Sequence, residues 1–289
     1  MSRVYLNGQF LPLAEACVPV LDRGFLFGDG VYEVIPAYGG HLFRLDAHLD
    51  RLGASLAAVR IGNPHDREGW KRVLQTLVDE AGPGDCSVYL QVTRGADVKR
   101  DHGFPPPEVR PTVFAMASPL HPPPRERLER GASARVMADI RWARCDIKAI
   151  TLLPNVLLRQ AALDAGDDEA ILVRDGLALE GSASSLFIVA DGILATPPKG
   201  PALLPGVTRD LVLELAQSHG RPWVERDIAE AELRCADEIW LTSSTREVTA
   251  VTRLDGVAVG DGRPGPVWRR MADWYRACKA ALRSGEECP

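Results

Sequence analysis

Lys148 is the residue of this chain whose neighbours most favour amine chemistry. The chain has 34 lysine and arginine residues, of which only five are lysines, and Lys148 stands beside Ile147 and close to Ile150. An arginine guanidinium stays protonated and cannot condense with an aldehyde, whereas a desolvated lysine amine can. Lys148 is therefore a candidate for covalent chemistry. The alternative is a lysine whose stem packs while its ammonium reaches water.

Two segments rich in hydroxyl and amide donors could bind a phosphate. The glycine turn in Leu204–Arg209 directly precedes a predicted helix. At such a helix start, the amides of Val207 and Thr208 and the Thr208 hydroxyl can point at an anion. The segment Thr242–Thr245, which contains Ser243 and Ser244, follows a predicted strand and offers further hydroxyls. Each segment alone is also typical of an ordinary turn.

Two charged side chains complete a set that suits one cofactor. Arg51 lies off the apolar face of a predicted helix and could add a charge-assisted bond to a phosphate. Glu180 ends a predicted strand, although a glutamate there is also typical of a surface position. A reactive lysine, a carboxylate and a phosphate site are the parts that pyridoxal phosphate needs. A carboxylate opposite the pyridine nitrogen would keep that nitrogen protonated, so that the ring could accept electrons from a breaking Cα–H bond.

The composition limits the class of protein. The chain has 289 residues, 46% of them hydrophobic and 25% charged, and a net charge of −5. There is no basic run or aromatic-interleaved basic stripe typical of nucleic-acid binding, and no apolar run approaches the ~20 residues of a membrane span. The six cysteines form no CxxC pair and no cysteine–histidine cluster at zinc spacing, so we expect no metal site. A cytoplasmic enzyme or binding protein is the expected class.

The N-terminal half is predicted to contain strands and one strong helix. Asn7-Gly8 between two short apolar runs indicates a tight hairpin. A glycine turn leads into a strand at Val31–Ile35, on which Tyr32 and its successor project to opposite faces. A leucine repeat predicts an amphipathic helix over Leu45–Val59, and Ser87–Arg94 is predicted to be a further strand that leads into a loop.

The proline-rich stretch at residues 119–125 is the best candidate for an interdomain linker. We therefore expect one domain over residues 1–118 and a second over 126–289, which carries the reactive lysine. In the second domain, Glu169–Val173, Leu177–Glu180 and Leu186–Ala190 are predicted to be antiparallel strands, and the closing helix carries Val267, Met271, Trp274, Cys278 and Leu282 in register. Antiparallel sheets covered by helices indicate an α+β fold.

The chain resembles the class IV aminotransferases, which are fold-type IV pyridoxal phosphate enzymes, and among them the D-amino-acid aminotransferases. The resemblance covers effectively the whole chain and rests on six motifs in order: Asp22–Glu33, His48–Leu52, Arg141–Lys148, Leu179–Ser182, Leu204–Arg209 and Thr242–Thr245. It implies a two-domain homodimer with the cofactor between the domains. It also implies residue roles: Lys148 as the Schiff-base lysine, Glu180 as the pyridine-nitrogen partner, Leu204 against the ring, and Arg51, Val207, Thr208 and Ser244 as phosphate binders.

The resemblance also implies a substrate. D-amino-acid aminotransferases bind the substrate carboxylate with a tyrosine after the glycine turn and with an Arg-x-His pair that reaches in from the neighbouring subunit. Tyr32, Arg100 and His102 match these positions. A phenol, a guanidinium and an imidazole can all donate to one carboxylate. We therefore expect transamination between a D-amino acid and a 2-oxo acid in two ping-pong half-reactions.

Four alternatives stay open at this point. The same scaffold also serves aminodeoxychorismate lyases, branched-chain L-amino-acid aminotransferases and amine transaminases, and a fold alone does not choose among them. The pair Arg100 and His102 is the feature that discriminates. A protein of a different class, one that binds pyridoxal phosphate without catalysis, would keep its colour while amino donors failed to convert it.

Overall fold

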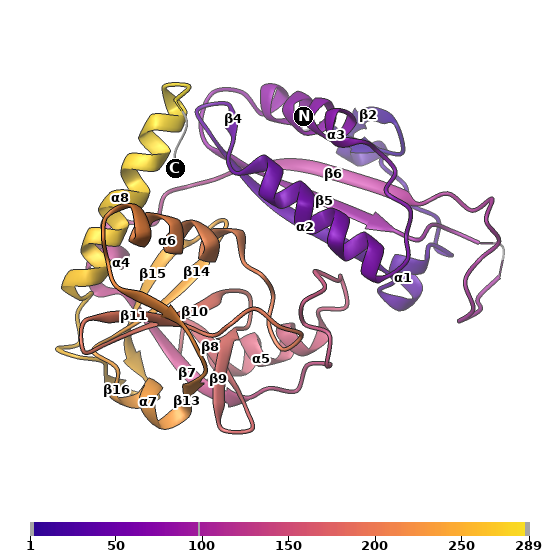
Figure 1. The fold of residues 1–289 in the computed structure, drawn as a ribbon. Helices are drawn as coiled ribbons and strands as arrows, with labels where there is room; N and C mark the ends of the chain where they lie inside the picture. The colour runs from indigo at the N-terminus through magenta and orange to yellow at the C-terminus, as the bar shows by residue number, and fades with distance from the viewer. Residues whose placement is uncertain (1–2, 98, 287–289) are drawn as a thin grey trace. The chain divides into compact units, whose positions relative to one another are not determined.

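The computed structural model describes residues 3–97 and 99–286, which form two compact units (Figure 1). Among the described residues, the first unit comprises those up to His121 together with Ile147–Leu152 and Leu282–Gly285. The second unit comprises the remaining described residues. No helix in the described parts of the chain has the length and apolar character that a bilayer crossing requires.

The division differs from the expected one at Lys148. The sequence places this lysine in the second domain, but the segment Ile147–Leu152 packs with the first unit. The cause is local, because Ile147 and Ala149 are buried in the first unit's core and the backbone of Lys148 accepts a hydrogen bond from the Tyr32 amide.

The first unit is built on a six-stranded antiparallel sheet with the order β2-β1-β6-β5-β3-β4. The predicted hairpin forms around Asn7 and Gly8, both of which have positive φ. The predicted strand after the glycine turn begins at Gly30 and runs to Tyr38, longer than expected. The strands are β1 (Arg3–Leu6), β2 (Gln9–Pro12), β3 (Gly30–Tyr38), β4 (His41–Leu42), β5 (Cys86–Thr93) and β6 (Thr112–Pro119).

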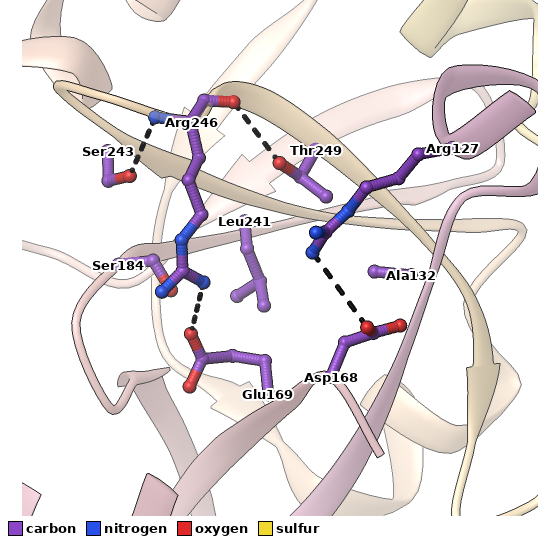
Figure 2. A pocket seen from close by; sticks show the side chains of 9 residues that line it. All are labelled: Arg127, Ala132, Asp168, Glu169, Ser184, Leu241, Ser243, Arg246 and Thr249. Atoms are coloured by element: carbon purple, nitrogen blue, oxygen red, sulfur yellow. Dashed lines mark hydrogen bonds and ion pairs between the residues drawn. The ribbon is translucent and has the colours of Figure 1, made fainter. Parts of the chain in front are cut away.

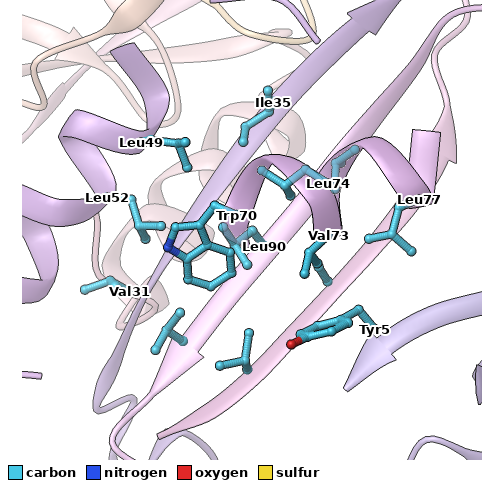
Figure 3. Packing of buried hydrophobic residues seen from close by; sticks show 14 of the residues in the cluster. Tyr5, Val31, Ile35, Leu49, Leu52, Trp70, Val73, Leu74, Leu77 and Leu90 are labelled. Atoms are coloured by element: carbon cyan, nitrogen blue, oxygen red, sulfur yellow. The ribbon is translucent and has the colours of Figure 1, made fainter. Parts of the chain in front are cut away.

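Two long helices cover this sheet, with their apolar faces in one core (Figure 3). The predicted leucine-repeat helix is confirmed as α2 (Leu45–Ala58), and α3 (Arg67–Ala81) packs beside it through Trp70 and Leu74. The short helices are η1 (Leu13–Glu15) and α1 (Arg23–Phe27), and α1 begins at the N-cap Asp22. Helix α2 thereby presents one side to β3, the strand that carries Tyr32.

The second unit contains a ten-stranded sheet that closes into a barrel. Nine strands follow the order β12-β11-β10-β14-β15-β7-β8-β9-β13, and the tenth, β16, pairs with β15 beside this path. An additional pairing of β9 with β10 closes the ring of strands. The expected antiparallel set β8, β9 and β10 is present, while β7 pairs in parallel with both β8 and β15. The strands are β7 (Ala132–Ala138), β8 (Glu169–Arg174), β9 (Leu177–Gly181), β10 (Ser185–Ala190), β11 (Ile193–Thr196), β12 (Trp223–Glu225), β13 (Ile228–Ala229), β14 (Glu238–Ser243), β15 (Glu247–Leu254) and β16 (Val257–Ala258).

An irregularity in β9 decides which way Glu180 faces. On β8, Leu172 pairs with Glu180 and Val173 pairs with Ala178, so that Leu179 is the extra residue of a bulge. Ala178 belongs to the core cluster inside the barrel. The bulge breaks the alternation, so Glu180 shares the face of its partner Leu172, which packs outside the barrel with helix α5.

Helices lie on the outside of the barrel. They are α4 (Arg125–Arg130), α5 (Leu153–Asp164), α6 (Val207–Ser218), α7 (Glu230–Cys235) and α8 (Pro266–Arg283). The predicted closing helix is confirmed as α8, but its most buried residues are Trp268, Met271, Tyr275 and Cys278. Two of these four lie one residue away from the expected register.

Candidate active site

The Lys148 amine lies against an aromatic ring in the first unit. Its Nζ is 4.2 Å from the centroid of the Tyr32 ring, and the side chain is half-buried. The backbone at Lys148 and at the next residue is fixed. The Lys148 amide donates to the Ser55 hydroxyl at 3.2 Å, and Ala149 forms a β-bridge with Val31. The backbone of Lys148 is therefore fixed in the first unit, and its partial burial is compatible with both interpretations of this lysine given above.

Tyr32 belongs to a small aromatic stack on the sheet. Its ring lies 5.8 Å from that of Tyr89, at an interplanar angle of 30°. The Tyr89 hydroxyl donates to Gln91 at 2.6 Å, and burial, followed by the nearby Tyr32, raises the pKa of Tyr89 to about 12. Tyr89 is therefore a neutral phenol at any physiological pH, and the stack holds the Tyr32 ring beside the lysine.

Arg51 is held by a buried carboxylate on β3. Its guanidinium donates from two nitrogens to both oxygens of Glu33, at 2.7 and 2.8 Å. Glu33 also contacts the His48 ring at 2.8 Å and is fully buried. Burial raises the pKa of Glu33, but Arg51 and His48 outweigh it and hold that pKa well below its usual range. Glu33 is thus an anion that fixes the direction of the Arg51 guanidinium.

Glu180 is the buried carboxylate of the second unit. Its Oε1 pairs with Arg141, and the Leu204 amide donates to both of its oxygens, at 3.3 and 3.2 Å. Arg141 is oriented in turn by Asp139, whose side chain is completely buried. Burial raises the pKa of Glu180, while Arg141 and the Leu204 amide act to lower it. The carboxylate is therefore fixed as an acceptor on the outer face of the barrel.

A row of polar side chains continues from Glu180 across the sheet. Glu180 pairs with Ser185 on β10, and Ser185 pairs with Thr242 on β14, so all three side chains share one face. The Thr242 hydroxyl is buried and has no hydrogen-bond partner. A buried hydroxyl without a partner is rare in folded proteins, and it marks this row as a place that a polar ligand could complete.

The N-terminus of α6 adjoins this row. A Cβ placed on Gly206 would lie 2.4 Å from the Ser185 hydroxyl oxygen, so glycine lets the helix start approach β10 without displacing that hydroxyl. Gly206 is the N-cap, and no side chain caps the helix. Val207 and Thr208, its first two residues, are buried. Helix amides, a helix dipole and hydroxyls gathered at one point are the features that the predicted anion site requires.

Ser243 faces the other way. It lines a small cavity with Ser184, Glu169 and Arg246, and its hydroxyl accepts a hydrogen bond from the Arg246 amide at 3.3 Å (Figure 2). Leu241, two residues earlier on β14, belongs to the barrel core. Alternation along the strand therefore separates Ser243 from Thr242 and from the Glu180 row.

The cavity of Figure 2 contains a charged network that braces the turn after Glu180. Glu169 accepts from Arg159 and Arg246, both at 2.7 Å, and from the Ser182 hydroxyl. Ser184 lies in the same turn, and its buried hydroxyl has no hydrogen-bond partner. The network anchors the backbone between β9 and β10, and thereby the register that aligns Glu180 with Ser185.

Arg100 and His102 lie together on an exposed loop of the first unit. The His102 ring is 5.2 Å from the ring of Phe27, and the Arg100 guanidinium is 5.0 Å from the same ring. Both side chains are exposed. The structure thus brings together Tyr32 with Lys148, and separately Arg100 with His102.

The comparison with known proteins decides the family. Residues 30–254 match the family model described as amino-transferase class IV. D-alanine aminotransferase from Bacillus licheniformis is 41% identical over 270 residues, which cover 93% of this chain and 94% of that protein. D-alanine aminotransferase from Staphylococcus haemolyticus is 36% identical and covers 95% and 97% of the two chains.

The chain belongs to the class IV aminotransferases. Solved structures agree with this assignment. The Escherichia coli branched-chain amino acid aminotransferase superposes with a TM-score of 0.90 at 28% identity, over 96% of this chain and 94% of that one. A second branched-chain amino acid aminotransferase, solved with pyridoxamine 5'-phosphate, has a TM-score of 0.88 at 28% identity, with the same coverage.

Several residues that organise the site of this class IV aminotransferase were not singled out from the sequence. In the first unit they are Glu33 and His48, and in the second unit Arg141 and Ser185. Glu33 had a detectable signal, because an acidic residue in the middle of an apolar strand needs a buried partner. Ser185 had none, because its alignment with Glu180 and with Thr242 of the predicted hydroxyl segment depends on strand pairs between segments far apart in the sequence.

Proposed function

We propose that this class IV aminotransferase moves the amino group of a D-amino acid to a 2-oxo acid, with pyridoxal phosphate as the cofactor. The relatives named D-alanine aminotransferase support the substrate class, and the neighbour with pyridoxamine 5'-phosphate supports the cofactor. The observation that carries the proposal is the position of the Lys148 amine, 4.2 Å from the ring of Tyr32. A reactive amine thereby adjoins a phenol that can bind a carboxylate.

The residues of the chain fit the cofactor. A phosphate would suit the α6 start, where Gly206 permits a close approach and the Thr242 hydroxyl lacks a partner. We assign the phosphate to Arg51, Val207, Thr208 and Ser244, and we leave Ser243 out because it shares the face of Leu241 on β14, opposite to that of Thr242. Bound there, the cofactor would supply an aldehyde carbon and a ring that withdraws electrons from the substrate Cα.

Each protein group has a task in the reaction. The incoming amino donor would displace the Lys148 amine from the cofactor. The free amine would then take the α-proton from the substrate and transfer it to the cofactor carbon, since it is the base that lies beside Tyr32. Glu180 would hold a proton on the pyridine nitrogen, because its carboxylate is fixed by Arg141 and by the Leu204 amide. Leu204 itself would lie against the ring.

The substrate carboxylate would be bound by Tyr32, Arg100 and His102. A guanidinium supplies two parallel donors to a carboxylate, and the imidazole and the phenol supply one each. These groups would fix the orientation of the Cα–H bond and so select the D-enantiomer. The homodimer and the cytoplasmic location expected from the sequence stay predictions.

Lys148→Ala tests the proposal. We expect a folded protein that binds the cofactor without the visible absorption of the lysine-bound form and that lacks transamination. The wild-type holoenzyme is mixed separately with D-alanine, D-glutamate, D-aspartate and their L-enantiomers, and the decay of its visible absorption is followed. Lys71→Ala, a change at a solvent-exposed lysine of α3, is the matched control. Transamination by Lys148→Ala at the wild-type rate would refute the role given to the amine.

Branched-chain L-amino-acid transamination is the second candidate. It is favoured by the structural neighbours that are branched-chain amino acid aminotransferases. The same screen separates the two candidates once L-leucine is added to it. Conversion by L-leucine and not by any D-amino acid would establish the second candidate and exclude the first.

A further inference from the structure

We infer that Arg23 and Phe27 of helix α1 are positioning residues that hold Arg100 and His102 in the geometry needed to bind a substrate carboxylate. The inference rests on the proposed function, in which these two side chains bind the carboxylate. It concerns residues that neither contact the proposed cofactor site nor carry a reacting atom.

Arg23 fixes the backbone of the loop. Its Nη1 donates to the carbonyls of Asp101 and Gly103, at 2.6 and 3.0 Å, and its Nη2 donates to the carbonyl of His102 at 3.3 Å. Its Nε donates to Asp29 at 2.8 Å. The guanidinium is buried, so water competes little for these bonds. Three successive carbonyls are therefore oriented by one side chain.

Phe27 fixes the side chains of the same loop. Its ring contacts the His102 ring at a centroid distance of 5.2 Å and the Arg100 guanidinium at 5.0 Å. The Arg23 guanidinium also lies over this ring, at 4.9 Å. Two cations and an imidazole thus share one aromatic surface. The ring limits the rotamers that Arg100 and His102 can adopt.

A second anchor holds the end of the loop. The Arg94 guanidinium lies 3.8 Å from the centroid of the Phe104 ring, and that of Arg60 lies 4.8 Å from it. Arg94 also donates to both oxygens of Asp29, at 2.8 and 2.9 Å. Asp29 joins the two anchors, because it accepts from Arg23 as well.

Helix α1 is tied to both strands from which the loop emerges. Its N-cap Asp22 accepts from the Gly24 amide and from the hydroxyls of Thr93 and Thr112, at 2.8, 2.9 and 2.6 Å. Thr93 ends β5 and Thr112 begins β6. The helix is therefore a rigid support, while Arg100–Gly103 is exposed and has no regular structure.

The consequence for binding follows from preorganisation. An exposed arginine and an exposed histidine would lose side-chain entropy on binding a carboxylate, and a loop held beforehand avoids part of that cost. A change that loosens helix α1 or its contacts with the loop should therefore weaken the binding of substrates that carry a carboxylate. An amine without a carboxylate should be unaffected, because it makes no contact with Arg100 or His102.

Two variants test the inference in the holoenzyme. Arg23→Lys keeps the charge that pairs with Asp29 but cannot donate to three carbonyls, and Phe27→Leu removes the ring with little change in volume. We expect kcat/KM for D-alanine to fall about ten- to a hundredfold, mainly through KM. The single-turnover rate with isopropylamine, in which a methyl group replaces the carboxylate, should stay within about twofold of the wild type.

Two further measurements separate positioning from general damage. Hydrogen–deuterium exchange of the peptide covering 99–105 should become faster in both variants, while exchange in β3 stays unchanged. In a background that carries Arg100→Ala and His102→Ala, Phe27→Leu should have no further effect on KM, because its partners are gone. Phe25→Leu, at the exposed phenylalanine of the same helix, is the matched control.

Three outcomes would overturn the inference: an unchanged KM for D-alanine in both variants, an equal loss with isopropylamine, or full additivity with the Arg100 and His102 changes. Each of these outcomes differs from the result expected if the proposed function itself is wrong. That failure would appear in the unaltered holoenzyme as no response to any D-amino acid.

Discussion

Glu33 shows how one buried residue supports the proposed chemistry without taking part in it. It lies in the middle of β3 with no exposed side-chain surface, and Arg51 and His48 are its partners. A buried carboxylate is tolerated only where cations and hydrogen bonds compensate for its lost hydration. The neighbouring residue Tyr32 points to the other face of the strand, so one strand carries both the support of Arg51 and a proposed substrate contact.

Glu33→Gln should destabilise the first unit by about 3–5 kcal/mol, because it removes the charge of the buried carboxylate that pairs with the buried Arg51 guanidinium. Urea unfolding of the apoprotein, followed by tryptophan fluorescence, measures the change. Glu15→Gln, at an exposed position of the same unit, is the control and should change the unfolding free energy by less than about 0.5 kcal/mol. Equal stabilities of Glu33→Gln and the wild type would contradict the importance given to this ion pair.

The same residue predicts a pH dependence. The pKa of Glu33 is lowered in the folded protein, mainly by Arg51 against the opposing effect of burial. A lowered carboxyl pKa contributes stability that is fully present above the unfolded-state value of about 4.3 and is lost as the pH falls below it. The difference in unfolding free energy between the wild type and Glu33→Gln should be constant from about pH 6 to pH 8. It should shrink when the measurement is repeated below about pH 4.

At the scale of elements, the sequence predicts those helices and turns whose signal lies within a short stretch of the chain. The leucine spacing of α2 and the Asn7-Gly8 turn are local signals, and both elements form where expected. The bulge at Leu179 was not predictable, because it is defined by the pairing of β9 with β8. The same holds for the row Glu180, Ser185 and Thr242, which exists only after the barrel has closed. The sequence therefore indicated Glu180 and the hydroxyl segment that contains Thr242, but not Ser185 or the alignment of the three residues.

Gly206→Ala should weaken cofactor binding while leaving the fold intact. The added methyl group would lie 2.4 Å from the Ser185 hydroxyl oxygen and 3.1 Å from the Arg209 Cβ, so this hydroxyl, which adjoins the proposed phosphate position, must move. Overpacking that costs the bound state about 1–3 kcal/mol corresponds to an affinity about five- to a hundred-and-fiftyfold weaker. Fluorescence titration of the apoprotein with pyridoxal phosphate measures the dissociation constant. Gly200→Ala, where a Cβ would meet open space, is the control, and an unchanged affinity in Gly206→Ala would remove α6 from the phosphate site.

At the scale of the whole molecule, the chain crosses between its two units more often than a single linker allows. Residues 147–152 leave the second unit, join the core of the first through Ile147 and Ala149, and return at α5. A domain boundary placed by proline content alone misses this segment, because the segment joins the first unit through burial against a distant strand.

The exposed apolar residues Leu153, Val156 and Leu157 follow directly, at 54–68% exposure, and such a surface on a helix is typical of a protein contact.

Mixing two variants, each with little activity at a D-alanine concentration near the wild-type KM, tests both the proposed homodimer and the subunit from which Arg100 and His102 act. One variant carries Lys148→Ala, and the other carries Arg100→Ala with His102→Ala. If the loop serves the neighbouring subunit, each mixed dimer has one site with an intact lysine and an intact loop. Random exchange should then restore about a quarter of the wild-type activity toward D-alanine, since half of the dimers are mixed and each has one working site of two. Co-purification through two different affinity tags confirms that mixed dimers form. Mixed dimers without restored activity would instead place the loop in the site of its own chain, because every site would then lack either the amine or the carboxylate-binding pair.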